Sequence, residues 1–370
     1  MNPDTLLLTP GPIPLPEPVR DILSEPLFHH RTPQFRAVLA SVSARLKQVF
    51  RTEAPVYTLA GSGTAGMEAA LVNFHSTGDA VLVLDTGKFG ERFTELAEAY
   101  GLKPEVIKVP WGQAVDPELV RERLLANPQL KSVFMQLCET STGIVNDVEA
   151  VGRVLKDSGV LLIVDAIAGL CADRFEMDLW HVDVAIAGSQ KALMLPPGLA
   201  FVAVAPRASL RMQEAGLPRY YLDLRRYEAA LKKGDTPFTP PISLVRAADK
   251  VLELILTERL ENIWWRSRRL GEYVRLRLNE MGFKLFAQAP SSALTAAFVP
   301  EAVDGSRLIT CLREEKGVTL AGGQGAFKGR LIRLAHMGSI TIHDLDEGLR
   351  AIEETLEEMK NSRKAEPALS

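Results

Sequence analysis

Six nearly continuous apolar segments occur between residues 54 and 205, separated by stretches with the spacing of amphipathic helices. Such segments fit strands that helices cover on both faces, because a strand with one solvated face alternates apolar and polar residues. We therefore predict a mostly parallel, doubly wound α/β sheet. The segments are APVYTLAG (54–61), AVLVLD (80–85), KSVFMQL (131–137), GVLLIVD (159–165), DVAIAG (183–188) and LAFVAVA (199–205).

The pattern changes after TPFTPP (236–241), where long helices are expected at 242–257 and 258–281. Short strands and two further helices follow, and this mixture is typical of a smaller α+β unit. A chain of 370 residues also exceeds one comfortable hydrophobic core. We predict an N-terminal segment (1–20), a large α/β domain (21–258), a small C-terminal α+β domain (259–360) and a flexible tail (361–370).

Composition and charge exclude several classes of protein. A net charge of −3 gives no electrostatic reason to expect a nucleic acid as partner. The cationic run WWRSRRLGEYVRLRL (264–278) is interpreted as the solvated side of a helix that joins two domains. We expect no membrane span and no signal peptide, because the apolar runs are short and the N-terminus is not basic. The three cysteines are too scattered for a zinc site or a disulfide framework, so a cytoplasmic protein without a metal is predicted.

The loop GSGTAG (61–66) follows one predicted strand and opens a predicted helix. It matches the dinucleotide fingerprint, and Asp85 ends the next strand as that fingerprint requires, so a nicotinamide-dependent dehydrogenase is one interpretation. However, a glycine-rich helix start exposes amides to any phosphate. The loop therefore indicates a phosphate without saying which one, and a tight structural turn is the alternative.

Lys191 and Asp165 each follow the apolar part of a predicted strand. If those strands are near neighbours, the amine and the carboxylate reach the same edge of the sheet, where ligands bind. With pyridoxal phosphate such a lysine binds the aldehyde covalently, and such an aspartate keeps the ring nitrogen protonated. Phe89 offers an aromatic face for the ring. Together with the phosphate loop, these residues predict pyridoxal phosphate as the cofactor.

Arg333 lies in the apolar segment RLIRLAH (330–336) and needs a planar anion as its partner. A substrate carboxylate is a natural bidentate ligand for such a guanidinium. A salt bridge within the small domain is the alternative, and the sequence leaves both open.

Over almost its full length, the chain resembles class V, fold-type I pyridoxal-phosphate aminotransferases. Within that class it is similar to the alanine–glyoxylate, serine–glyoxylate and serine–pyruvate aminotransferases. The segments that carry the resemblance are LLLTPGP (6–12), GSGTAGMEAA (61–70), ETSTG (139–143), VDAIAG (164–169), GSQKAL (188–193), TPFTPP (236–241) and RLIRLAHMG (330–338).

The resemblance implies a role for each matching residue. Lys191 would bind the cofactor covalently, Asp165 would bind its ring nitrogen, and Phe89 would stack on its ring. Thr140 would lie near the phenolic oxygen of the cofactor. The substrate carboxylate would bind Arg333, and Gly11 would line the same cleft. The phosphate would be held by Ser62, Gly63, Thr64 and Gln190, with Thr239 from a neighbouring subunit.

The family also implies a ping-pong transfer of an amino group from a small amino acid, Ala or Ser, to glyoxylate or pyruvate, and a homodimer with shared active sites. Alanine–glyoxylate members often have Trp at Phe89, His at Thr64 and Tyr at Thr236, so the preferred donor and acceptor stay open. A 2-aminoethylphosphonate–pyruvate transaminase and a hydrogenase-associated subunit with a non-catalytic role are the alternatives. A cysteine desulfurase is disfavoured because the loop 322–329 has no cysteine.

Overall fold

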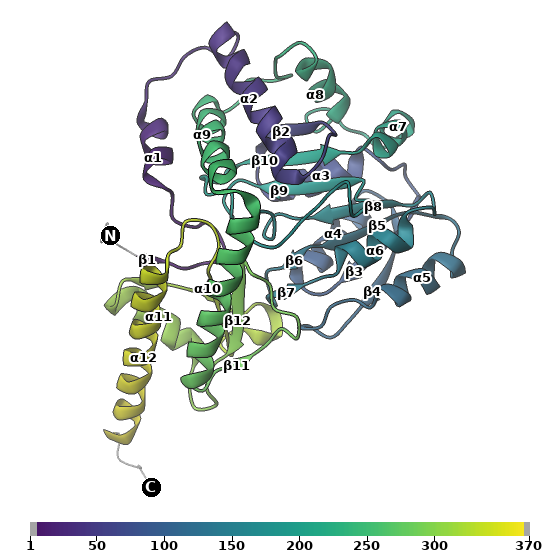
Figure 1. The fold of residues 1–370 in the computed structure, drawn as a ribbon. Helices are drawn as coiled ribbons and strands as arrows, with labels where there is room; N and C mark the ends of the chain where they lie inside the picture. The colour runs from purple at the N-terminus through teal and green to yellow at the C-terminus, as the bar shows by residue number, and fades with distance from the viewer. Residues whose placement is uncertain (1–5, 366–370) are drawn as a thin grey trace.

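The computed structural model describes residues 6–365, and a seven-stranded sheet forms the centre of its upper half (Figure 1). Only β10 runs antiparallel to its neighbours, β2 and β9, whereas all other adjacent strands are parallel. The predicted α/β sheet is therefore confirmed. In spatial order the strands are β2 (Val56–Gly61), β10 (Gly198–Val204), β9 (Val184–Gly188), β8 (Leu161–Asp165), β5 (Leu130–Gln136), β3 (Ala80–Asp85) and β4 (Lys103–Lys108).

The edge strand β4 was not among the predicted strands. Its sequence, KPEVIK, carries charges, and its first and last residues are exposed. An edge strand has one neighbour and meets solvent on its other side, so it lacks the continuous apolar run of an interior strand.

Helices cover both faces of the sheet. Within β5, Phe134 packs against one group of helices, whereas Val133 and Met135 pack against the other group. The first group comprises α3 (Gly63–Val72), α4 (Lys88–Ala99), α7 (Pro206–Glu214) and α8 (Leu224–Leu231). The second comprises α1 (Glu17–Ser24), α2 (Pro33–Phe50), α5 (Pro117–Ala126), α6 (Val148–Leu155) and α9 (Ile242–Glu258). Burial on both faces explains why the interior strands are apolar throughout.

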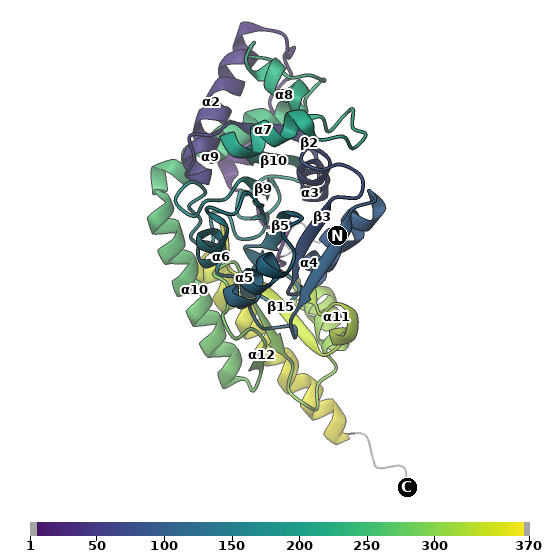
Figure 2. The ribbon, with the colours of Figure 1, turned by 90° about the vertical axis from the view of Figure 1, so that its right-hand side faces the viewer.

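A four-stranded antiparallel sheet forms the centre of the C-terminal part, which α10 and α12 flank in the lower half of the molecule (Figure 2). Its strands, in order, are β11 (Lys284–Leu285), β12 (Leu294–Phe298), β15 (Leu331–Ala335) and β14 (Ala321–Gly322). The helices here are α10 (Leu260–Glu280), α11 (Gly305–Glu315), the 3₁₀ turn η1 (Gly325–Phe327) and α12 (Ile342–Ala365). Helix α12 therefore extends into the predicted tail, of which residues 366–370 lie outside the described residues.

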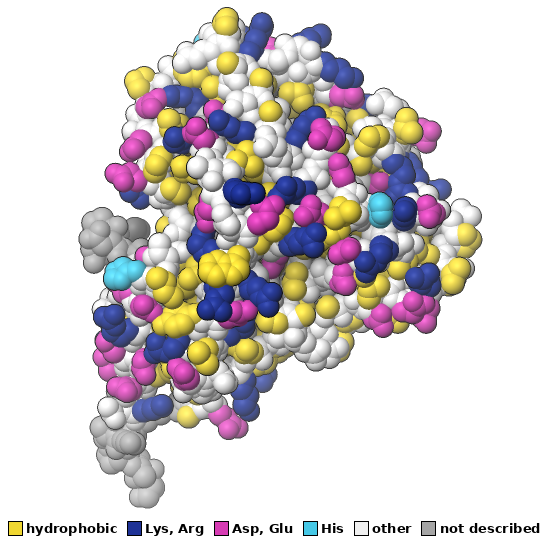
Figure 3. All heavy atoms as spheres, viewed as in Figure 1, with side chains coloured by type: hydrophobic (Ala, Val, Ile, Leu, Met, Phe, Trp, Pro, Cys, Tyr) yellow, Lys and Arg dark blue, Asp and Glu magenta, His cyan; other side chains and the backbone are white. Residues whose placement is uncertain are grey.

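The cationic run lies on α10, as predicted. On the face shown in Figure 3, basic and acidic side chains are interspersed. Along α10, Arg268 and Arg269 both pair with Glu272, and Arg277 pairs with Glu280. The positive charge of the run is therefore balanced locally by acidic residues of the same helix.

Two helices begin at side chains that cap their first turn. The carboxylate of Asp116 accepts a hydrogen bond from the Glu118 amide at the start of α5. Before α12, the Asp344 amide donates to Thr341 Oγ1 and the Thr341 amide donates to the Asp344 carboxylate, which is the reciprocal pattern of a capping box. No helix within residues 6–365 is both long and apolar enough to cross a bilayer.

The N-terminal segment connects the two sheets. Strand β1 (Leu6–Leu7) pairs in parallel with β13 (Val318–Thr319), and the Ala335 amide donates to the Leu8 carbonyl. From Leu6 onward, the described chain therefore lies beside the C-terminal part, and α1 then packs against α9. At the other junction, α9 ends at Glu258, where the sequence places the boundary between the domains.

Candidate active site

Asp165 and Lys191 lie at the same edge of the large sheet. Asp165 ends β8, which pairs in parallel with β9, and Lys191 follows β9 by three residues. Asp165 is buried, and its Oδ1 accepts a hydrogen bond of 2.8 Å from the Ile167 amide. Its other oxygen makes no hydrogen bond to any described residue, so that oxygen is available for a ligand.

The N-terminal segment closes over Lys191. The ammonium group of Lys191 donates a hydrogen bond to the Pro10 carbonyl. Gly11 has a φ of +121°, and a Cβ added to it would lie 2.5 Å from Lys191 Cδ and 2.7 Å from Nζ. Only glycine combines this backbone conformation with so close an approach. The structure therefore places Gly11 beside Lys191.

The surroundings of these two groups bring both pKa values toward neutrality. Desolvation lowers the pKa of Lys191 to about 8, and the positive charge of Arg333 acts in the same direction. Burial raises the pKa of Asp165 to about 7, and the Glu139 carboxylate adds to this effect. An amine with such a pKa can both take and return a proton near pH 8.

The start of α3 is a site for an anion at this edge. The side chain of its N-cap residue, Ser62, makes no capping hydrogen bond, and the amides of Gly63 and Thr64 have no acceptor among the described residues. Gln190 lies nearby; its buried Oε1 is an acceptor without a partner, so only its side-chain NH₂ could donate to an anion. A Cβ on Gly63 would lie 2.6 Å from Ile167 Cδ1, so a larger residue there would force the Ile167 side chain to move. Unpaired amides at a helix start favour a phosphate.

The sequence model of the family "Aminotransferase class-V" matches residues 25–350. The chain belongs to the class-V aminotransferase family. Three relatives align over nearly the whole enzyme. "Soluble hydrogenase, small subunit" of Synechococcus sp. is 39% identical, covering 97% of this chain and 94% of that protein. "L-aspartate--glyoxylate aminotransferase" of Paracoccus denitrificans is 34% identical, covering 90% and 87%. "Serine--glyoxylate aminotransferase" of Arabidopsis thaliana is 31% identical, covering 95% and 90%.

Solved structures show that the aminotransferase has the fold-type I architecture. It resembles an aspartate aminotransferase of subgroup IV from Thermus thermophilus, with a TM-score of 0.89, 36% identity and coverage of 95% of this chain and 99% of that one. It also resembles an alanine–glyoxylate aminotransferase from Nostoc sp., with a TM-score of 0.93, 31% identity and 96% coverage of both chains.

The aminotransferase uses pyridoxal phosphate, as its family does, and the described residues fit that cofactor. When bound, pyridoxal phosphate supplies an aldehyde for amines and a ring that withdraws electrons from the α-carbon. The free oxygen of Asp165 suits a protonated ring nitrogen, and the α3 amides suit the phosphate. Lys191 supplies the amine from the same edge of the sheet.

Glu139, which the sequence analysis did not single out, organises one wall of the aminotransferase site. Its buried carboxylate accepts hydrogen bonds from the Phe89 amide (2.9 Å) and the Gly90 amide (3.2 Å). It also accepts from the amide (3.0 Å) and the hydroxyl (2.6 Å) of Ser141. Glu139 therefore holds the start of α4, and with it the ring of Phe89. Its position beside Thr140 in the ETSTG segment was the available signal.

Arg333 has no acidic partner among the described residues. Its Nε donates to the Gly322 carbonyl (2.9 Å), and one terminal nitrogen donates to the Thr140 carbonyl (3.0 Å). The described residues thus form no salt bridge to it within the small domain, which was the alternative interpretation. An arginine bonded only to carbonyls keeps its charge available for a carboxylate.

Thr239, in the TPFTPP segment, lies near the end of β2, since Ala60 lines the same hollow. It is exposed and lines this hollow with Tyr221, Phe238 and Pro240, at which none of the other predicted site residues lies. This position is compatible with a role in a neighbouring subunit, which stays a prediction.

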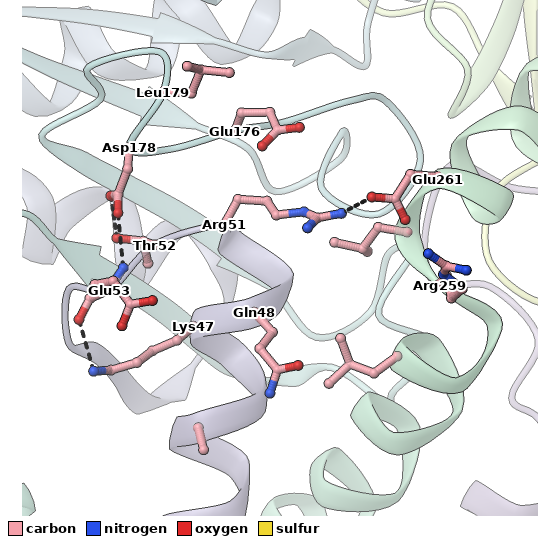
Figure 4. Close-up of a pocket in the computed structure, with 13 residues that line it drawn as sticks. Lys47, Gln48, Arg51, Thr52, Glu53, Glu176, Asp178, Leu179, Arg259 and Glu261 are labelled. Carbon is pink, nitrogen blue, oxygen red and sulfur yellow. Dashed lines mark hydrogen bonds and ion pairs between the residues drawn. The ribbon is translucent and has the colours of Figure 1, made fainter.

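A larger hollow of about 760 Å³ lies between the end of α2, the loop after β8 and the α9–α10 junction (Figure 4). None of the predicted site residues lines it. Several of its charged groups are paired within it, because Arg51 binds Glu261 and the Glu53 amide donates to Asp178. The aminotransferase chemistry therefore belongs to the sheet edge and not to this hollow.

Proposed function

We propose that the enzyme moves an amino group from a small amino acid, Ala or Ser, to glyoxylate or pyruvate by a ping-pong mechanism. The observation that carries the proposal is the guanidinium of Arg333, which has no acidic partner among the described residues and whose charge acts on the Lys191 amine. The guanidinium would bind the α-carboxylate of the amino acid, and the Lys191 amine would then act at its α-carbon. Relatives with 31% and 34% identity are named as glyoxylate aminotransferases, which supports a 2-oxo acid of this size.

Each site residue has a proposed task. Lys191 would hold the cofactor covalently, and once the amino acid has displaced it, its freed amine would move the α-proton as general acid and base. Asp165 keeps the ring nitrogen protonated, and Phe89 stacks on the ring. Thr140 lies near the phenolic oxygen, and Gly11 lines the cleft beside Lys191. The proposed phosphate ligands are Ser62, Gly63, Thr64 and Gln190, with Thr239 of a second subunit.

We further propose a cytoplasmic homodimer. The support for the dimer is that Thr239 is exposed and matches a phosphate ligand that the family takes from a neighbouring subunit. The support for the cytoplasm is that Cys138, Cys171 and Cys311 are all free thiols. Analytical ultracentrifugation tests the dimer, and a monomer at working concentrations would contradict it.

Aspartate is a second candidate donor. The Paracoccus relative is named for aspartate and glyoxylate, and the Thermus structure is titled an aspartate aminotransferase. Relatives named as hydrogenase subunits have a higher identity, but the Lys191 and Asp165 pair at one sheet edge has no use in a purely structural subunit.

The experiment combines spectra with a donor screen. The purified enzyme should show a visible absorption band that borohydride removes, and Lys191→Ala should lack both the band and turnover while its circular dichroism is unchanged. Lys232→Ala, an exposed lysine paired with Glu228, is the matched control. Ala, Ser, Asp and 2-aminoethylphosphonate are then tested with glyoxylate and pyruvate. Turnover with the phosphonate alone, or an active Lys191→Ala variant, would overturn the proposal.

A further inference from the structure

Arg92 is a cation at the edge of the active site that the family resemblance did not point out. It lies on α4 three residues after Phe89, and its guanidinium carbon is 4.7 Å from the centre of the Phe89 ring. One terminal nitrogen donates a hydrogen bond of 3.2 Å to Thr64 Oγ1. Arg92 therefore bridges the ring-stacking residue and the start of α3.

Arg92 differs from the cations around it because it has no acidic partner. No carboxylate among the described residues lies within 4.0 Å of its guanidinium, whereas Lys88 pairs with Glu91 at 2.6 Å and Lys108 pairs with Asp85 at 3.6 Å. Glu68, on the facing helix α3, accepts its hydrogen bond from Tyr100 instead. A half-buried guanidinium bonded only to a hydroxyl and an aromatic face is still able to bind an anion.

The contact of Arg92 with the start of α3 indicates which anion it could bind. Thr64, which Arg92 contacts, is the second residue of α3, and its own amide is one of those without an acceptor. A group held by these amides therefore lies beside the guanidinium. We propose that Arg92 binds the phosphate group of the cofactor, adding a full positive charge to the neutral donors at the start of α3.

This assignment has an electrostatic reason. A phosphate ester carries up to two negative charges, whereas a helix N-terminus supplies roughly half a positive charge. The other residues expected to hold the phosphate, Ser62, Gly63, Thr64 and Gln190, are all neutral. Without Arg92 most of the charge would stay unbalanced within the described chain. The charge of Arg92 also lowers the pKa values of Asp165 and Lys191, so it acts on the same edge of the sheet.

The test compares two ligands that differ only in the phosphate. The enzyme and its Arg92→Gln and Arg92→Lys variants are freed of cofactor and titrated with pyridoxal phosphate and with pyridoxal, using the visible band. Arg92→Gln should weaken the binding of pyridoxal phosphate about tenfold or more, as for a lost charge-assisted hydrogen bond, and leave pyridoxal unchanged. The affinity of Arg92→Lys for pyridoxal phosphate should lie between those of the wild type and Arg92→Gln. Lys88→Gln, which removes a charge from the same helix, is the matched control and should bind both ligands normally.

Two results would overturn the proposal. An equal loss for both ligands would mean that Arg92 supports the ring or the fold, and circular dichroism would separate these two. Unchanged affinity for pyridoxal phosphate would mean that Arg92 does not reach the phosphate. The inference rests on the cofactor, but the titration contains no amino donor. A failed donor screen would therefore refute the proposed substrates and leave this inference standing.

Discussion

Asp165→Asn should make the cofactor-free protein more stable while it abolishes turnover. The carboxylate of Asp165 is buried without a cationic partner in ion-pair contact, and burial raises its pKa from 3.8 to about 7. Asn keeps an oxygen that can accept the hydrogen bond from the Ile167 amide, so the substitution removes the charge and little else. In the variant, the ring nitrogen of the cofactor would have no carboxylate to keep it protonated, so turnover should be lost.

The size and sign of the effect follow from the two pKa values. Below pH 3.8 the carboxyl group is protonated in both states and contributes nothing. Between pH 3.8 and about 7 the unfolded chain releases the proton first, so rising pH destabilises the folded protein by about 1.36 kcal/mol per pH unit. Above pH 7 the cost is constant at about 4 kcal/mol. Among the groups that face Asp165, Glu139 raises its pKa further, whereas Lys191 and Arg92 lower it.

Urea unfolding of the cofactor-free wild type and Asp165→Asn between pH 5 and 8.5 measures this cost. The variant should be more stable by about 2 kcal/mol at pH 5 and about 4 kcal/mol at pH 8, with a plateau above pH 7. A difference that does not change with pH would refute the reasoning, because only a titrating carboxylate produces the slope. A less stable variant at pH 8 would show that the charge is compensated.

Three further substitutions test the site. Arg333→Gln should raise the KM for the amino donor about tenfold or more, with the visible band retained, because the guanidinium is the proposed anchor of the substrate carboxylate; a change in the band without a change in KM would contradict that role. Glu139→Ala leaves four buried donors without an acceptor and should lower the free energy of unfolding by about 3 kcal/mol or more in urea titration, with a smaller loss in Glu139→Gln. Gly63→Ala places a Cβ 2.6 Å from Ile167 Cδ1 and should weaken the binding of pyridoxal phosphate, measured by titration, more than it weakens folding.

The architecture of the large sheet could be predicted because its interior strands are buried on both faces and therefore apolar throughout. The same rule missed β4, whose outer edge meets solvent. The glycine loop, Asp165 and Lys191 were recognised because each ends or follows a strand, and ends of parallel strands meet at one edge. That these residues lie at one edge could therefore be predicted without knowing how the rest of the chain packs.

Other parts of the site depended on contacts that the sequence does not encode locally. Gly11 reaches Lys191 because β1 pairs with β13, across more than 300 residues of chain. The buried carboxylate of Glu139 is satisfied by its neighbour Ser141 and by the amides of Phe89 and Gly90, which belong to α4, a distant segment of the chain. Arg92 is one of many arginines until α3 and α4 pack together and leave it without an acidic partner.

By itself, the sequence determined the interior strands of the large sheet and the family, and it predicted the cofactor-binding edge, because these depend on local periodicity and on short segments in chain order. Tertiary structure decided which carbonyl the lysine meets, which carboxylate holds the ring-stacking residue and which arginines stay unpaired. The physical reason is that burial and charge pairing are properties of the packed chain. A residue's partners, and the resulting pKa values, exist only when distant segments meet.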